Sequence, residues 1–372
     1  MPESISAIGI ACALGVDCET VLRKALAGDV SGLSPWREPL VDEGRTLFGY
    51  VPLADSFCSK FSFRCDALLA ACADQIWGQV GRILGRTRPE RVAVVVGTSN
   101  STMDEMATGG PPVDMAHPAA FLRRKLGICG PALTISTACS SGAKVFETAR
   151  RLMRQGVCEA AIVGGVDAYC RTTVAGFYAL EATSLRRCQP MGQGRNGITL
   201  GEGAALLVLE REESIGVRLC GVGESSDAYH LTAPLPDGGG AEAAMRLALE
   251  DANLSPGEIG YINLHGTGTR QNDLMESLAV SRVFGTEKVR CSSTKPMTGH
   301  TLGAAGAIEA ALCALMLREG NLLLPHRLDG ERDPALPKIP LAAIGERAEV
   351  RYALSNSFAF GGSNAALILG KE

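Results

Sequence analysis

The sequence predicts an α/β fold, in which buried strands alternate with amphipathic helices. Short stretches rich in apolar and β-branched residues alternate along the chain with apolar residues at helical spacing. The 44 glycines gather at the ends of the apolar runs, a position typical of strand-to-helix turns in α/β folds. No low-complexity linker divides the 372 residues. Two halves of comparable size, each with strands and buried helices, fit a duplicated α/β unit.

Six segments are predicted to be buried strands because they are short, apolar and bounded by turn-forming residues. In chain order they are Arg91–Val96, Leu133–Ser136, Ala160–Val166, Ala204–Leu209, Ile259–Leu264 and Ala365–Leu369. Three apolar stripes at helical spacing predict helices that pack into the core. They comprise Val145, Ala149, Leu152 and Met153; Met245, Ala248, Leu249 and Ala252; and Ile308, Leu312, Leu315 and Met316. The small-residue run from Gly303 to Ala307 predicts a helix buried between layers.

The composition is that of an ordinary globular protein, with 46% hydrophobic and 20% charged residues. The formal net charge of −4 gives no global attraction to nucleic acid or to an anionic membrane. Any docking site for an acidic partner must therefore be local. The densest basic run is Arg123, Arg124 and Lys125, which is either such a site or an ordinary solvated helix face.

The sequence also predicts a cytoplasmic location. The first residues, Met-Pro-Glu-Ser-Ile-Ser, lack a basic region and a long apolar core, and no apolar run reaches membrane-spanning length. The 13 cysteines are scattered singly, without Cys-x-x-Cys pairs. This pattern predicts reduced thiols, most of them small core residues.

One cysteine stands apart from the others by its context. The segment Thr134-Ile-Ser-Thr-Ala-Cys139 predicts a strand and a tight turn, followed by a helix that runs to about Gln155. At a helix N-terminus, unpaired backbone N–H groups and the macrodipole favour a thiolate over a thiol, and they can stabilise an oxyanion on a bound thioester. Local chemistry alone leaves a second interpretation open, a buried structural cysteine.

Two of the five histidines lie in Gly/Thr-rich loops directly after predicted strands, where α/β sheets place their chemistry. His265 follows the strand that ends at Leu264, and His300 follows a strand over Val289–Cys291. A cysteine and a histidine brought together by the fold form a recognised nucleophile arrangement, and two neutral imidazoles can donate to one enolate oxygen. A Cys-His metal site is the rival interpretation. Since the sequence has neither a His-Glu-x-x-His helix nor a close cysteine pair, no metal site is predicted.

Five motifs occur in a fixed order along the chain. They are Thr137-Ala-Cys-Ser-Ser-Gly142, Gly201-Glu-Gly203, Asn263-Leu-His-Gly-Thr-Gly-Thr269, Ser293-Thr-Lys-Pro-Met-Thr-Gly-His300 leading into Leu302-Gly-Ala-Ala-Gly306, and Asn356-Ser-Phe-Ala-Phe-Gly-Gly-Ser-Asn364. Together they resemble the elongating type of β-ketoacyl-acyl-carrier-protein synthase, a member of the thiolase superfamily, over nearly the whole chain. The resemblance implies two similar α/β halves, residues 1–210 with the nucleophile and 211–372 with the histidines. The halves would form a five-layered α-β-α-β-α arrangement.

The resemblance also implies catalytic roles. Cys139 would accept an acyl group from the phosphopantetheine thioester of a carrier protein. His265 and His300 would assist decarboxylation of malonyl-carrier protein and stabilise the resulting enolate. The backbone N–H groups of Cys139 and Phe360 would hold the tetrahedral oxyanion. Lys295 would orient the loop of His300 and tune its electrostatics.

Further residues take their expected roles from the same resemblance. Thr267 and Thr269 look like the hydroxyls that bind the pantetheine arm. Phe360 is similar to the gating phenylalanine of the family, and Phe358 flanks it. Glu309 looks like a buried structural glutamate that pairs with the catalytic lysine or helps to hold a monovalent cation. No other cofactor is implied.

The chain departs from the family pattern at three places. Ala359 stands where glycine is usual, which stiffens a loop thought to move. The segment Gln189–Gly197 lacks the usual Arg-Pro-Phe-Asp beginning, and the region Gly97–Leu133 is short for a fatty-acid elongation enzyme. The main expectation is therefore a synthase of fatty-acid biosynthesis, with a ketosynthase of an aryl-polyene or type II polyketide pathway as the alternative.

Partners follow from the same resemblance. An acyl carrier protein is expected to deliver the substrates, and a homodimer or a heterodimer with a related subunit is expected. A non-catalytic partner subunit similar to a chain-length factor is the alternative from another functional class. Such subunits typically lack the nucleophile, whereas this chain has Cys139, His265 and His300.

Overall fold

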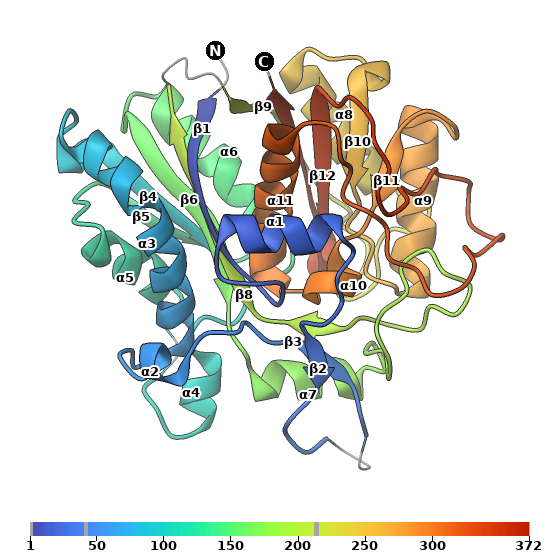
Figure 1. The fold of residues 1–372 in the computed structure, drawn as a ribbon, viewed down its shortest axis with the longest axis horizontal. Helices are drawn as coiled ribbons and strands as arrows, with labels where there is room; N and C mark the ends of the chain where they lie inside the picture. The colour runs from blue at the N-terminus through green and yellow to red at the C-terminus, as the bar shows by residue number, and fades with distance from the viewer. Residues whose placement is uncertain (1–2, 41–43, 113, 212–215, 372) are drawn as a thin grey trace.

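The computed structural model describes residues 3–40, 44–112, 114–211 and 216–371 (Figure 1). The strands are β1 (Glu3–Ala11), β2 (Leu33–Pro35), β3 (Leu47–Gly49), β4 (Val92–Gly97), β5 (Ala132–Ile135), β6 (Ala160–Asp167), β7 (Leu200–Gly201), β8 (Gly203–Glu210), β9 (Val217–Ser226), β10 (Ile259–Asn263), β11 (Arg290–Ser292), β12 (Tyr352–Phe358) and β13 (Ser363–Lys371). The helices are α1 (Cys18–Leu26), α2 (Asp55–Cys58), α3 (Arg64–Leu84), α4 (Met103–Ala107), α5 (His117–Lys125), α6 (Ser141–Arg154), α7 (Arg171–Ala179), α8 (Gly239–Ala252), α9 (Arg270–Phe284), α10 (Lys295–Thr298) and α11 (Ala305–Glu319).

The two halves of the chain repeat one sheet topology. Within the described residues, the main sheet has the strand order β11-β10-β12-β13-β9-β1-β8-β6-β4-β5. In the first half β4 pairs parallel with β5 and β6, and the pairs β6–β8 and β8–β1 are antiparallel. In the second half β10 pairs parallel with β11 and β12, and the pairs β12–β13 and β13–β9 are antiparallel. The predicted duplication is confirmed by this identical order and direction.

The halves meet along one edge, where β1 pairs antiparallel with β9 over Glu3–Ile5 and Val217–Leu219. The predicted boundary between Glu210 and Arg211 falls beside residues 212–215, which lie outside the described residues. That boundary stays a prediction.

Three apolar cores hold the five layers together in the described part of the chain. One core joins α3 and α5 to the outer face of the first half. The central core contains α6 and α11 between the halves, and the third joins α8 and α9 to the outer face of the second half. The layers therefore follow the predicted α-β-α-β-α order (Figure 1).

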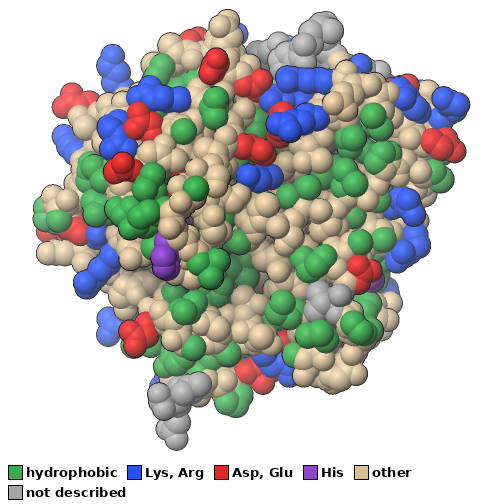
Figure 2. Space-filling model, turned by 180° about the vertical axis from the view of Figure 1, so that it is seen from behind, with side chains coloured by type: hydrophobic (Ala, Val, Ile, Leu, Met, Phe, Trp, Pro, Cys, Tyr) green, Lys and Arg blue, Asp and Glu red, His purple; other side chains and the backbone are tan. Residues whose placement is uncertain are grey.

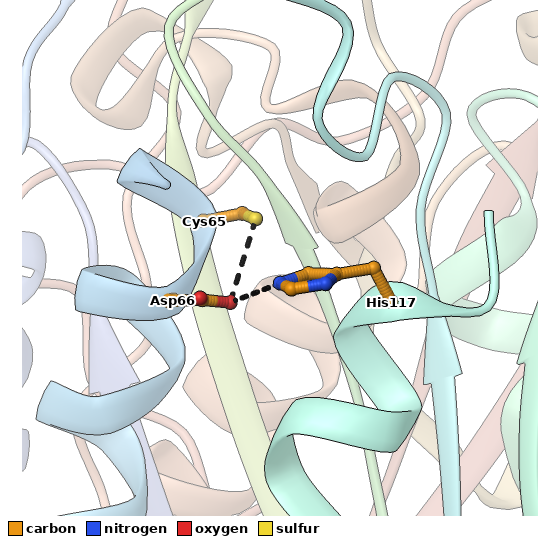
Figure 3. A group of neighbouring side chains, drawn as sticks. All are labelled: Cys65, Asp66 and His117. Atoms are coloured by element: carbon orange, nitrogen blue, oxygen red, sulfur yellow. Dashed lines mark hydrogen bonds and ion pairs between the residues drawn. The ribbon is translucent and has the colours of Figure 1, made fainter. Parts of the chain in front are cut away.

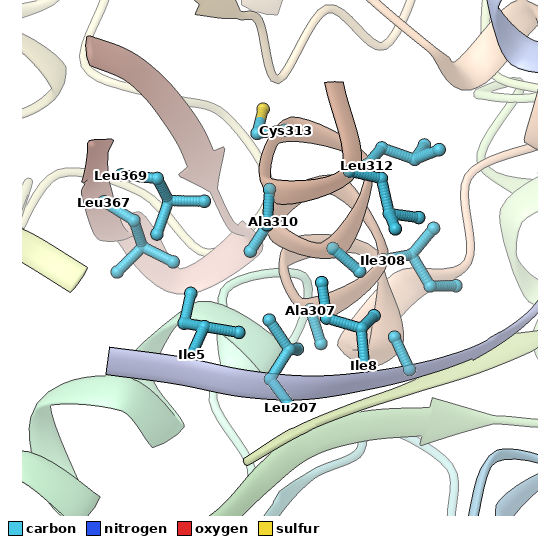
Figure 4. Packing of buried hydrophobic residues seen from close by; sticks show 14 of the residues in the cluster. Ile5, Ile8, Leu207, Ala307, Ile308, Ala310, Leu312, Cys313, Leu367 and Leu369 are labelled. Carbon is cyan, nitrogen blue, oxygen red and sulfur yellow. The ribbon is translucent and has the colours of Figure 1, made fainter. Parts of the chain in front are cut away.

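Strands that are covered on both faces explain the continuous apolar runs in the sequence. In β8, Leu206 and Val208 face the outer core, whereas Leu207 and Leu209 face the central core. Because successive side chains of a strand point to opposite faces, a strand covered on both sides must be apolar at every position. Figure 4 shows the central core, in which side chains from β1, β8 and β13 pack around α11.

All six predicted strands are confirmed as β4, β5, β6, β8, β10 and β13, and the three predicted helices as α6, α8 and α11. The small-residue prediction is also confirmed, because α11 is buried over Ala305–Leu317. The prediction of burial is wrong for β5. It is the last strand of the sheet, and the side chain of Leu133 is 39% exposed.

Two smaller features complete the fold. Strands β2, β3 and β7 form a second, three-stranded sheet in the described part of the chain. No helix among the described residues combines the length and the apolar character that crossing a membrane requires.

Candidate active site

Cys139 lies in the turn between β5 and α6, as the sequence predicts. The hydroxyl of Ser141 braces this turn, since it accepts a hydrogen bond from Thr137 N at 2.9 Å and donates one to Ala138 O at 2.5 Å. Ala138 has φ of +52°, a left-handed conformation that is unfavourable for a residue with a side chain. The turn is therefore sharp and strained, and the thiol is held by backbone geometry.

Two glycines allow the nucleophile helix to approach the segment after His300. A Cβ atom on Gly142 would lie 2.6 Å from Gly303 O, and one on Gly306 would lie 2.7 Å from Ala143 N. Real Cβ atoms do not approach backbone atoms so closely, so a side chain at either position would separate the two segments. The small residues of these motifs thus bring the two halves of the site together.

Both predicted histidines lie beside Cys139. His300 Nε2 is 3.1 Å from Cys139 Sγ, and the rings of His265 and His300 are nearly perpendicular, with centroids 5.3 Å apart. The backbone N–H of His300 donates to Thr199 O at 2.6 Å. The Cys-His-His cluster predicted from the sequence therefore forms in the fold.

The environment keeps both imidazoles neutral. Burial lowers the pKa of His265 and of His300 well below the usual value, and the positive charge of Lys295 lowers both further. Lys295 Nζ lies 3.5 Å from His265 Nδ1. Because an ammonium only donates, Nδ1 accepts and the proton of His265 is on Nε2. His300 Nδ1 has no hydrogen-bond partner among the described residues, so either tautomer is open to His300.

The expectation of a resting thiolate is wrong. Burial raises the pKa of Cys139 to about 12, and the charge of Lys295 only partly offsets this effect. Desolvation of a buried anion outweighs the field of a helix that begins two residues later. The resting thiol is therefore neutral, and the nucleophile needs a base, for which His300 Nε2 is in place.

Lys295 makes direct contacts with His265 and acts on His300 through its charge. Its Nζ donates to His265 O at 2.5 Å and to Glu309 Oε1 at 2.6 Å. The predicted pairing of Glu309 with the lysine is confirmed. The predicted electrostatic effect on His300 is borne out, because the charge of Lys295 lowers the pKa of that histidine. The predicted role of Lys295 in orienting the loop of His300 stays a prediction.

A cavity of about 650 Å³ opens beside the nucleophile. Cys139 and both histidines line it, together with Thr267, Thr269, Phe358 and Phe360 from the predicted set. Lys295 and Glu309 are buried behind His265 and do not line it. Figure 2 shows hydrophobic side chains gathered around a hollow on the rear face of the molecule.

The phenylalanine loop closes one side of this cavity. Phe360 is 37% exposed, and its ring lies 5.6 Å from that of Phe177 on α7. Phe358 is buried, with its ring 6.0 Å from that of His265. Ala359 has extended dihedrals that any residue adopts, so the alanine is unstrained in this conformation. The gating and pantetheine-binding roles of these residues stay predictions.

Glu276 on α9 is a site residue that sequence reasoning missed. Its buried carboxylate accepts hydrogen bonds from His265 N and Gly266 N, both at 2.7 Å, and from Asn356 Nδ2 at 3.2 Å. Burial raises its pKa to about 7, and the backbone donors oppose that rise. The sequence signal that could have identified Glu276 was an acidic residue on the buried face of a helix.

His326 is the second missed residue. Its Nδ1 accepts from Ser293 N at 3.1 Å, and its Nε2 donates to Pro190 O at 2.8 Å. Ser293 Oγ in turn donates to Gly266 O at 2.7 Å. His326 therefore ties the loop of Lys295 and His300 to Pro190, while Ser293 ties that loop to the loop of His265. Nothing in the sequence separates His326 from an ordinary histidine.

Three buried side-chain oxygen atoms are of the kind that a monovalent cation binds. Glu309 Oε2, Asn263 Oδ1 and Ser357 Oγ are buried without a hydrogen-bond partner among the described residues. Oxygen atoms of this kind suit a hard cation. The cation stays a prediction.

Two family profiles match the chain. The profile described as the N-terminal domain of β-ketoacyl synthases matches residues 62–214, and that described as the C-terminal domain matches residues 217–328. The chain is 37% identical over 283 residues to 3-oxoacyl-[acyl-carrier-protein] synthase 2 of Staphylococcus aureus strain COL, covering 72% of this chain and 65% of the relative. It is 39% identical over 263 residues to the enzyme of the same name from Vibrio harveyi, covering 66% and 63%. The chain thus covers less than two thirds of the length of each of these relatives.

Two solved structures are similar over the whole chain. The ketosynthase ApeO in complex with its chain length factor ApeC, from Xenorhabdus doucetiae, superposes with a TM-score of 0.87 at 40% identity, covering 100% of this chain and 98% of that one. The ishigamide ketosynthase/chain length factor superposes with a TM-score of 0.89 at 30% identity, covering 100% and 99%. The duplicated fold, the Cys-His-His cluster and these matches lead to one conclusion: the chain belongs to the β-ketoacyl synthase family.

Proposed function

We propose that this chain is a β-ketoacyl-carrier-protein synthase, which transfers an acyl group to Cys139 and condenses it with a malonyl unit. The observation that supports this most is the 3.1 Å approach of His300 Nε2 to Cys139 Sγ in a cavity that His265 also lines. A buried neutral thiol next to a neutral imidazole is suited to covalent acyl transfer, in which the base takes the proton as the sulfur attacks.

Acyl transfer would proceed as follows. Cys139 Sγ attacks the carbonyl carbon of the acyl thioester while His300 Nε2 takes the thiol proton. The backbone N–H groups of Cys139 and Phe360 are proposed to hold the oxyanion. When the tetrahedral intermediate collapses, the phosphopantetheine sulfur leaves and regains the proton from His300. Cys139 then carries the acyl group as a thioester.

Decarboxylation and condensation would follow in the same cavity. The malonyl thioester oxygen accepts hydrogen bonds from His265 Nε2 and from His300 in its Nε2–H tautomer. Loss of CO2 leaves an enolate, which these two neutral donors stabilise without becoming anionic themselves. The enolate carbon attacks the acyl carbon on Cys139, and the cysteine sulfur leaves as a thiolate. This thiolate takes one proton, delivered from solvent through His300 Nε2, and so returns to the neutral thiol. The product is a β-ketoacyl thioester on the carrier protein.

The test compares Cys139→Ala with Cys129→Ala, which removes an exposed cysteine that does not line the cavity. We expect Cys139→Ala to abolish β-ketoacyl product while malonyl-carrier protein is still decarboxylated, because that step needs the histidines and not the thiol. Cys129→Ala should behave as the wild type. A β-ketoacyl product from Cys139→Ala would contradict the proposal.

A secondary-metabolite ketosynthase is the second candidate for the pathway. A chain from the complex of the ketosynthase ApeO with its chain length factor is 40% identical and covers the whole of this chain, whereas 3-oxoacyl-[acyl-carrier-protein] synthase 2 of Staphylococcus aureus aligns over 72% of it. The short region between Gly97 and Leu133 agrees with this candidate. Loading of Cys139 with short, long and aryl-polyene acyl chains separates the two. Loading restricted to unconjugated fatty chains would remove this candidate.

We also propose an acyl carrier protein as substrate donor and a related subunit as partner, either a second copy or a chain-length-factor-like protein. The outer edge of β5 is a place for the partner, since within the described residues β5 pairs with β4 alone and Leu133 is exposed there. Leu133→Lys should weaken assembly, measured as the native mass of the chain alone and with a chain length factor. An unchanged native mass would exclude this edge.

The non-catalytic alternative is disfavoured by the retained Cys139 and His300.

A further inference from the structure

We propose that Cys65, Asp66 and His117 form a Zn²⁺ site that links α3 to α5, separate from the Cys-His-His cluster. The three side chains offer one thiol sulfur, one carboxylate oxygen and one imidazole nitrogen, all within 4.8 Å of one another. Figure 3 shows Asp66 between the other two, with its carboxylate facing both. Sulfur, nitrogen and oxygen donors of these kinds are the ligands that zinc takes in proteins.

The geometry is close to what the metal requires. His117 Nε2 is 2.8 Å from Asp66 Oδ1, and Cys65 Sγ is 3.9 Å from the same oxygen. Tetrahedral zinc, with bonds of about 2.0–2.3 Å, separates its ligand atoms by roughly 3.4–3.6 Å. A movement of His117 Nε2 away from Asp66 by about 0.6–0.8 Å, with a smaller approach of Cys65 Sγ, would therefore give the ion its place.

Both helices hold the ligands firmly. Cys65 and Asp66 belong to the first turn of α3, and His117 is the first residue of α5. The ring of Phe63 packs edge-on against His117 at 4.6 Å. Cys65 is fully buried and Asp66 nearly so, whereas the His117 side chain is 17% exposed. The exposed side leaves room for a water molecule as the fourth ligand.

Zinc binds cysteine as the thiolate, so the Cys65 thiol must lose its proton when the ion enters. On binding, the sulfur–zinc bond replaces the S–H bond and the thiol proton leaves to solvent.

The experiment uses the full-length Cys139→Ala protein, so that no thiolate–cobalt band can come from the main cavity. After metal is removed, Co²⁺ is titrated as a spectroscopic substitute and then displaced with Zn²⁺. We expect one Co²⁺ per chain, with a thiolate-to-cobalt charge-transfer band that Zn²⁺ abolishes, and a higher Tm with Zn²⁺ bound.

Matched variants locate the ion. Cys65→Ser should abolish the charge-transfer band, and His117→Gln should weaken Co²⁺ binding at least tenfold. Cys129→Ser and His230→Gln alter an exposed cysteine and an exposed histidine. These two variants should change neither the charge-transfer band nor the affinity for Co²⁺. If Cys65→Ser fails to fold, His117→Gln alone still tests the site. Absence of the band in the parent protein, or a band that persists in Cys65→Ser, would overturn the proposal.

Discussion

Replacing Lys295 with methionine tests the buried ion pair behind the histidines. Lys295 and Glu309 are both nearly inaccessible to solvent, with Nζ and Oε1 2.6 Å apart. Methionine keeps much of the length and the apolar stem of lysine but removes the charge. The ammonium also donates to His265 O, so the substitution deprives both the carboxylate and the carbonyl of their donor.

The expected loss of stability follows from the burial of the pair. Removing one partner of a buried ion pair costs about 3–5 kcal/mol, because the remaining charge is left without compensation. An exposed pair contributes about 0–1 kcal/mol. Lys24 and Asp29 form such a pair at 3.9 Å, with both side chains more than a quarter exposed, so Lys24→Met is a matched control.

A double-mutant cycle measures the interaction. We expect Lys295→Met and Glu309→Gln to lower the free energy of urea unfolding separately, and to show a coupling of about 2–3 kcal/mol when combined. The lysine charge lowers the pKa of both histidines, so Lys295→Met should also shift the acid limb of the decarboxylation rate to higher pH. Additivity within about 0.5 kcal/mol would refute the inference that the two groups interact as a pair.

Three further predictions concern neighbouring features. Burial lowers the pKa of His326 to about 4 from a usual value of 6.5, so below pH 6.5 the unfolded chain binds a proton that the folded chain does not. Wild-type stability should therefore fall between pH 6.5 and pH 4 by on the order of 3 kcal/mol more than that of His326→Gln, as measured by urea unfolding at both ends of this range. An equal fall in the stability of the wild type and of His326→Gln over this pH range would contradict this prediction. Gly306→Ala should lower the unfolding free energy by about 1–3 kcal/mol and reduce condensation, because its Cβ would lie 2.7 Å from Ala143 N; full stability and activity would show that the helices can separate. Reversing the charges of Arg123 and Arg124, which are exposed in the last turn of α5, should weaken binding of an acidic carrier protein in titration calorimetry, and an unchanged affinity would leave them as an ordinary helix end.

The interior of the fold could be predicted because strands covered on both faces leave a continuous apolar signal. Strands β4, β6 and β8 carry that signal. Strands β1, β9 and β12 do not carry a continuous apolar signal, since serine, glycine or charged residues interrupt each of them. In β12 the interruption has a structural cause: Asn356 is polar because it donates to Glu276 beneath the loop of His265.

Site residues that belong to a sequence motif could be predicted, whereas those defined by burial or by partners distant in the chain could not. Cys139, His265 and His300 were found from strand-to-loop positions and from the family resemblance. The predicted preference of Cys139 for the thiolate form was wrong. The sequence shows that Cys139 precedes a helix, but it does not show the burial that has the largest effect on the pKa of the thiol. His326 was missed for the same reason, since its partners Ser293 and Pro190 are distant in the chain.

The central claim is that Cys139 is the residue that carries the acyl group. Its most direct test is the intact mass of the protein after incubation with a panel of acyl-carrier thioesters. We expect a gain of one acyl group per chain in the wild type and in Cys129→Ala, and no gain in Cys139→Ala. An acyl adduct of equal yield in Cys139→Ala, or none in the wild type with any acyl chain, would contradict it.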